Sequence, residues 1–180
     1  MKKWLLLIGA VLVVFAYFSF SSQNSPYARL DEIEKKYGVA DSMMPASEES
    51  TQMLKAELSS LKKSLQGDSS RDAEAVIVLV NVRLDLAEAA LKLYSAKKNL
   101  GAMSPFSNNC LPGKPAFEAE KLLDESVAKA KNASDRMKLF LGSYSAEAGK
   151  FGITDNYAKG YSDFLEESVL IDKHSMEIFC

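Results

Sequence analysis

Beyond residue 46, apolar and polar residues alternate with a helical period along most of the chain. The clearest series precedes Gly67 and consists of Leu54, Leu58, Leu61 and Leu65. This spacing of four, three and four residues places the leucines on one face of a helix. Glu48 and Glu49 follow Ser47, and acidic residues are favourable in a first helical turn. We therefore predict an amphipathic helix over residues 47–66.

The next predicted helix, over residues 70–100, has two apolar faces. One series consists of Ala73, Ile77, Val80, Leu84, Ala87, Leu91 and Tyr94. The other consists of Leu79, Val82, Leu86, Ala89, Leu93, Ala96 and Leu100. Because little more than a narrow polar line separates them, we expect this helix to pack on two sides as the central member of a bundle. The β-branched run at residues 75–80 also fits a strand, but the helical period continues to Leu100 without a turn signal.

Capping and turn residues delimit the other predicted helices. A serine followed by proline, and a later glycine, predict a short helix over residues 26–37. A proline and a later glycine likewise delimit residues 115–141, where the inward positions are predicted to be Ala119, Leu123, Val127, Ala130, Met137 and Leu141. A threonine at residue 154 caps a last helix, whose apolar face contains Tyr157, Tyr161, Phe164, Ile171 and Ile178.

These patterns predict an all-α fold in three parts. Residues 1–22 form an N-terminal transmembrane signal anchor, and residues 23–46 form a short juxtamembrane helix and linker. Residues 47–180 form an antiparallel up-down four-helix bundle, because long amphipathic helices with coiled-coil spacing are joined by modest loops.

The membrane prediction depends on a run of apolar residues that follows Lys2 and Lys3. Its apolar members are Trp4, Leu5, Leu6, Leu7, Ile8, Val11, Leu12, Val13, Val14, Phe15, Tyr17, Phe18 and Phe20. As a helix, residues 4–20 span about 25 Å, close to the ~30 Å hydrocarbon core of a bilayer. The positive-inside rule places both lysines in the cytoplasm. We therefore expect a single-pass cell-membrane protein with an extracytoplasmic body.

A cleaved signal peptide is the alternative interpretation of the same segment. Ser19 and Ser21 flank Phe20 in a small-x-small pattern that fits cleavage near Ser21, which would make the protein secreted. The apolar run exceeds the usual ~7–15 residues of a signal-peptide core, which favours an uncleaved anchor. Both interpretations leave the body outside the cytoplasm.

Charge and cysteine content limit the partners of the body. All 24 acidic residues follow the apolar segment, whereas two of the 22 basic residues precede it, so the body has a net charge of about −4. This balance disfavours nucleic acid. The two cysteines, Cys110 and Cys180, are too few for a clustered metal site. In an up-down bundle the loop over residues 101–115 lies at the same end as the C-terminus, so we predict a Cys110–Cys180 disulfide.

The remaining candidate residues have ordinary structural explanations beside functional ones. Tyr157, Tyr161 and Phe164 either pack in the core or line a ligand pocket. In the loop over residues 142–153, Tyr144 and Phe151 either cap the core or contact a partner. We interpret His174, the single histidine, as a surface residue. Asn132-Ala133-Ser134 matches an N-glycosylation sequon, although its mid-helix position disfavours modification.

We expect a non-enzymatic, membrane-tethered interaction or scaffold domain without a cofactor. The lipid bilayer would bind residues 4–20, and a protein partner or a second copy would bind the helical faces. The alternative is a ligand-binding or sensory bundle with a pocket near the aromatic face of the last helix. An enzyme is the least favoured class, because the sequence contains no recognisable catalytic constellation.

Overall fold

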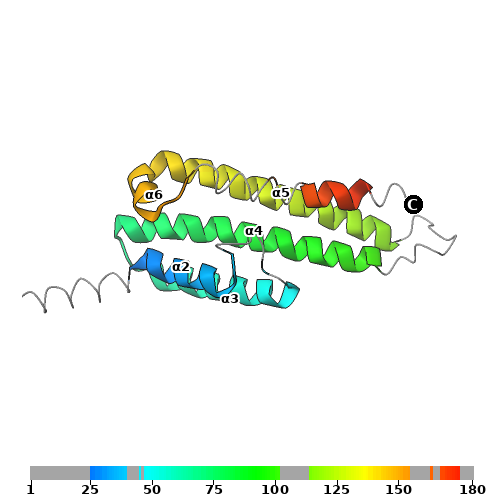
Figure 1. Cartoon of the computed structure of the whole chain (residues 1–180), viewed down its shortest axis with the longest axis horizontal. Coiled ribbons are helices and arrows are strands. Elements are labelled where there is room, and N and C mark those ends of the chain that lie inside the picture. Colours follow the sequence, from blue (N-terminus) through cyan, green and yellow to red (C-terminus); the bar gives the residue numbers. More distant parts are fainter. Residues whose placement is uncertain are drawn as a thin grey trace, which may run out of the picture.

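The computed structural model describes residues 25–39, 45, 47–101, 114–154, 163 and 167–174, and these residues form helices and connecting turns without a strand. The labelled helices are α2 (Pro26–Lys36), α3 (Glu48–Leu65), α4 (Arg71–Gly101), α5 (Lys114–Ser143) and α6 (Ser145–Phe151). Residues 167–174 are also helical. The predicted all-α class and the bundle arrangement are therefore confirmed for the described part of the chain (Figure 1).

The helix starts follow the capping residues of the sequence. The Ser25 hydroxyl accepts a hydrogen bond from the Ala28 backbone N–H at 3.1 Å, directly before α2. The Ser47 hydroxyl accepts one from the Ser50 N–H at 3.1 Å, directly before α3. Each bond satisfies a backbone donor that the first turn leaves without a helical partner. After α2 the backbone of Gly38 has a φ of 67°, a left-handed conformation that glycine adopts without strain.

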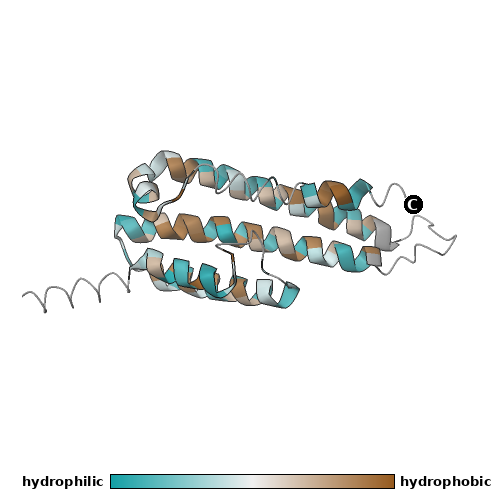
Figure 2. Ribbon diagram, in the orientation of Figure 1, coloured by the Kyte–Doolittle hydropathy of each residue, from teal (hydrophilic) through white to brown (hydrophobic). Residues whose placement is uncertain are grey.

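Helix α4 is the central element, as its two apolar faces predict. Helices α2 and α3 lie along one side of α4, and α5 lies along the other (Figure 1). Helices α2 to α5 run in alternating directions, so the start of α4 lies at the same end of the bundle as the end of α5 (Figure 1). Hydrophobic residues follow the length of α4, whereas hydrophilic residues are frequent on the outer helices (Figure 2).

The contact between α4 and α5 is a seam of small and large side chains. Its buried residues on α5 recur at alternating spacings of four and three: Ala119, Leu123, Ser126, Ala130, Ala133, Met137 and Phe140. The matching series on α4 is Ala75, Leu79, Val82, Leu86, Ala89, Leu93 and Ala96. The Ser126 hydroxyl donates a 2.8 Å hydrogen bond to the backbone oxygen of Ala89, so a serine side chain alone spans the gap between the helices. This is coiled-coil spacing with close backbone approach.

The seam differs from the predicted inward face of α5 at three positions. Ser126, Ala133 and Phe140 are buried at 0–1% exposure, whereas Val127 and Leu141 are only partly buried. The alternating four-three register passes through Ser126, whose hydroxyl is satisfied by a backbone carbonyl. Apolar character alone favours Val127 and therefore selects the neighbouring register.

Two helices of the described fold are not among the predicted bundle helices. Helix α2 packs on α3 and α4 and buries Leu30 at 1% exposure, and Val39 after it is 3% exposed. The short helix α6 was not predicted, because seven residues are too few to display a helical period. Gly152 ends α6 with a φ of 69°.

Several predicted features lie outside the described residues. The predicted anchor over residues 1–22 is one of them, and no helix within the described ranges is long and apolar enough to cross a membrane. Cys110 and Cys180 also lie outside, so their disulfide stays a prediction. The described residues nearest to Cys180 in the sequence are 167–174. They bind the end of the bundle where α4 stops and α5 starts, through an ion pair between Lys97 and Asp172 at 3.5 Å and another between Lys173 and Asp124.

The seam gives a first prediction, made with Ala130→Leu. Ala130 is fully buried between α4 and α5, so a larger side chain must push the helices apart or adopt a strained rotamer. We expect the free energy of unfolding to fall by about 1–3 kcal/mol, measured by urea denaturation with circular dichroism on the purified chain. The control is Ala128→Leu on the exposed face of the same helix, which should change it by less than about 0.5 kcal/mol. Equal effects of both variants would contradict the seam.

Candidate functional site

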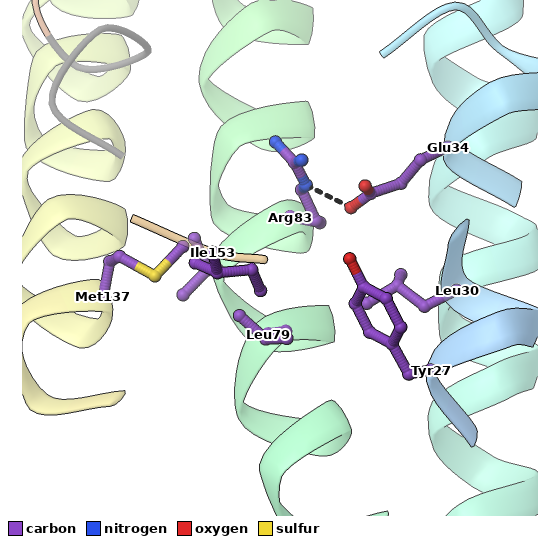
Figure 3. A pocket seen from close by; sticks show the side chains of 8 residues that line it. Tyr27, Leu30, Glu34, Leu79, Arg83, Met137 and Ile153 are labelled. Carbon is purple, nitrogen blue, oxygen red and sulfur yellow. Dashed lines mark hydrogen bonds and ion pairs between the residues drawn. The ribbon is translucent and has the colours of Figure 1, made fainter. Parts of the chain in front are cut away.

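The most unusual group in the described core is an ion pair between α2 and α4. Nε of Arg83 donates to Oε1 of Glu34 at 2.5 Å, and the two side chains are 5% and 10% exposed. In Figure 3 the two side chains point toward each other from their helices. Charged side chains of these types are rarely buried unless they are paired, because removal from water costs several kcal/mol per ion. The pair therefore fixes which residue of α2 lies opposite Arg83.

Arg83 is buried because it belongs to the face of α4 that meets α2 and α3. The buried residues on this face recur at alternating spacings of three and four: Ala73, Val76, Val80, Arg83, Ala87 and Ala90. The predicted stripe contained Ile77, Leu84 and Leu91 instead, and these three are only partly buried. At every second position of the stripe, the buried residue is therefore the one directly before the predicted residue. Sequence reasoning missed Arg83 because it preferred the more apolar neighbour at each of these positions.

Tyr27 joins α2 to the segment after α5. Its hydroxyl donates a 2.8 Å hydrogen bond to the backbone oxygen of Phe151, and the two rings stack with centroids 4.1 Å apart and planes inclined by 2°. Partial burial raises the pKa of Tyr27 above its ordinary value, and the neighbouring carboxylates of Glu34 and Asp31 add to this effect. The hydroxyl therefore keeps its proton as a donor at neutral pH.

Of the five candidate aromatic residues, two lie among the described residues. Phe151 is 8% exposed and packs on Tyr27, so it closes this end of the core. Tyr144 stacks on Phe140 at 5.7 Å, and the guanidinium of Arg71 lies 5.2 Å from its ring. Tyr157, Tyr161 and Phe164 lie outside the described residues.

A small cavity lies beside the ion pair, between α2, α4 and α5. Its lining residues are Tyr27, Leu30, Glu34, Leu79, Val82, Arg83, Met137 and Ile153, most of which Figure 3 labels. Its volume is about 10 Å³, which is room for about one water molecule. An organic ligand needs a cavity of roughly 300 Å³ or more. The groups around this cavity can bind water, but there is no space for a substrate.

A second ionic cluster connects α3, α4 and α5. Glu88 accepts Lys129 at 2.7 Å and Lys55 at 2.9 Å, and Asp85 lies 3.6 Å from Lys129 and 2.8 Å from Arg136. The hydrogen bond from Lys129, followed by that from Lys55, lowers the pKa of Glu88 from 4.5 to about 2. The same contact with Glu88 raises the pKa of Lys129. Three helices therefore share one group of alternating charges.

The chemistry available at these two clusters is structural. In both, carboxylates are bound by arginine or lysine, and no group of three metal-ligating side chains occurs within the described ranges. Elsewhere, His174 and Asn132 are exposed. The charges hold helices together, and we identify no nucleophile with an adjacent base in the part of the chain that the structure describes.

Glu88 gives a prediction for pH dependence. Because its pKa is lower in the folded state, its contribution to stability is present above about pH 4.5 and is lost as the pH falls through about 2. Glu88→Gln should lower the free energy of unfolding by about 1 kcal/mol at neutral pH, a modest value because the carboxylate is partly exposed. The difference from the unmodified chain should shrink between pH 4.5 and 2.

The measurement is urea denaturation of both chains at several pH values. Glu74→Gln on the exposed side of α4 is the matched control and should change stability by less than about 0.5 kcal/mol at neutral pH. A Glu88→Gln difference that stays constant with pH would show that the ion pairs of Glu88 do not contribute as described.

Comparison with known proteins does not assign the chain to a family. No protein-family model, curated protein or solved structure matches it. A function must therefore be inferred from the geometry of α2, α4 and the ends of the bundle.

Proposed function

We propose that the chain is a membrane-tethered, extracytoplasmic interaction or scaffold protein. The observation that carries this proposal is the docking of α2, which begins at Pro26, soon after the predicted anchor over residues 1–22. Tyr27 and Glu34 bind α2 to Phe151 and Arg83, so the segment nearest the anchor belongs to the folded bundle. An anchor joined in this way would hold a rigid body beside the membrane.

The connection also defines a membrane-proximal and a distal end. Residues 23–25 span at most about 10 Å, so the start of α2 would lie within that distance of the bilayer. The α3–α4 turn and α6 belong to this proximal end (Figure 1). Helix α4 has 31 residues and is about 46 Å long, so its C-terminal end is the distal end.

The distal half of the bundle exposes large apolar residues that support a protein partner. Phe117 near the start of α5 is 70% exposed, and Leu170 and Ile171 are 64% and 66% exposed. Residues 167–174 dock through buried Val169 and the ion pairs of Asp172 and Lys173, which leaves Leu170 and Ile171 facing outward. Apolar residues at an exposed end are typical of protein–protein contacts.

The alternative ligand-binding function is less well supported. It depends on Tyr157, Tyr161 and Phe164, which lie outside the described residues. The cavity beside Arg83 has room for about one water molecule and therefore gives this alternative no support.

Membrane fractionation tests the tether. With a C-terminal reporter that is active only outside the cytoplasm, the full chain should sediment with membranes and show reporter activity, because residues 4–20 would span the bilayer. A control chain without residues 4–20 should be soluble and inactive. An intact mass that retains Lys2 and Lys3 excludes cleavage near Ser21. Recovery of the full chain in the soluble cytosolic fraction would refute the proposed function.

Photo-crosslinking tests the distal contact. A photoreactive residue at position 117 or 171 should give a specific adduct in intact membranes, and Leu170→Ser with Ile171→Ser should remove the adduct formed from position 117. The matched control is Leu139→Ser, because Leu139 is equally exposed, at 69%, near the proximal end of α5. All these positions are exposed, so the free energy of unfolding of each variant should lie within about 0.5 kcal/mol of that of the unmodified chain. An adduct that persists in the double variant would place the contact elsewhere.

A further inference from the structure

Helix α2 contributes little apolar surface to the core compared with its neighbours. Its 11 residues bury Leu30 and Glu34, and thus a single apolar side chain. Helix α3 buries four leucines, at Leu54, Leu58, Leu61 and Leu65. Because apolar burial is the main source of packing energy, α2 is attached more weakly per residue than α3.

Besides the stacking of Tyr27 on Phe151 and the partly buried Ile33, the other attachments of α2 are polar contacts. Lys36 and the Tyr37 hydroxyl bind Glu57 of α3 at 2.5 and 2.8 Å, and Arg29 donates to the Ser64 hydroxyl at 2.8 Å. The Lys36–Glu57 and Arg29–Ser64 contacts are exposed, and exposed pairs contribute little to stability because water competes for both partners.

The buried pair of Glu34 and Arg83 does not replace the missing apolar contact. Both charges lose hydration when α2 docks, and their mutual attraction roughly offsets that loss. The adjoining cavity leaves the underside of α2 incompletely packed. When α2 separates from α4, both charges regain water, which lowers the free-energy cost of separation. The pair thus determines where α2 docks more than it stabilises the docked state.

We propose that α2 is a latch, which separates from α3 and α4 as a unit while the α3–α4–α5 bundle stays folded. The latch ends before Pro45, whose backbone oxygen accepts a 2.8 Å hydrogen bond from the Tyr94 hydroxyl of α4. Val39 is buried beside α2, so the latch includes residues 26–39. Local opening of this kind is expected where few apolar contacts hold an element.

Latch opening would change the reach of the tether, and this consequence depends on the proposed function. With α2 docked, the bundle lies within about 10 Å of the bilayer. With α2 released, its helix of about 16 Å and the chain from residue 37 to Pro45 together span at most about 45 Å. The same anchor would therefore hold the bundle close to the membrane or let it reach outward.

Native-state hydrogen exchange on the full chain in lipid nanodiscs tests the latch. We expect the amides of α2 to exchange at least about 100-fold faster than those at the centre of the α4–α5 seam, because α2 opens alone. Equal rates in α2 and the seam would mean that they open as one unit, and this result would overturn the proposal.

A double substitution tests the role of the ion pair. Glu34→Leu with Arg83→Met replaces two buried charges by apolar side chains of similar length, and we expect exchange in α2 to slow by at least about tenfold. Exchange in the α4–α5 seam is the internal control and should not change. The matched pair Asp31→Asn with Lys35→Gln removes an exposed ion pair on α2, at 2.7 Å, and should leave the exchange rates nearly unchanged.

The outcomes separate the latch from the tether. Unchanged or faster exchange in α2 of the folded Glu34→Leu, Arg83→Met chain would overturn the role of the pair in easing release. If that chain does not fold, the comparison between α2 and the seam in the unmodified chain still decides whether a latch exists. A chain that is soluble without lipid would refute the tether, and exchange in α2 would then be measured in solution with the same criterion.

Discussion

Burial of α4 on two sides is the constraint on which the rest of this structure depends. A helix with two apolar faces must be covered by separate neighbours, and here α5 covers one face while α2 and α3 cover the other. The small residues of the α4–α5 seam allow close approach, which the bond between Ser126 and the Ala89 carbonyl displays directly. Helices α2 and α3 pack on this central pair from the other side of α4.

The charged residues of α4 determine where those neighbours bind. Arg83 and Asp85 are two residues apart and therefore point to nearly opposite sides of the helix. Arg83 pairs with α2, whereas Asp85 pairs with Lys129 and Arg136 of α5. A shift of either neighbour by one helical turn would leave a charge buried without its partner, which is strongly unfavourable. Each charge thus selects one register among several that apolar contacts alone would allow.

The sequence contains enough information for the helices but not for every contact between them. The caps at Ser25 and Ser47, and the central place of α4, follow from local spacing and are observed. The buried positions of Arg83 and Ser126 could not be predicted from apolar character, since each has a more apolar neighbour one position later in the sequence. Their burial depends on partners in other helices, Glu34 and the Ala89 carbonyl, which one-dimensional spacing does not reveal.

Helices α5 and α2 are attached to α4 by different kinds of interaction, and this asymmetry matters if the chain is tethered as proposed. The α5 side has a continuous apolar seam, so its separation exposes much surface and is costly. The α2 side has one buried leucine in the helix and a charge pair whose separation is partly offset by hydration. If the proposed anchor precedes α2, any force between membrane and bundle passes first through the weaker side. The core that carries the distal surface would then be insulated from the membrane by the element that opens most easily.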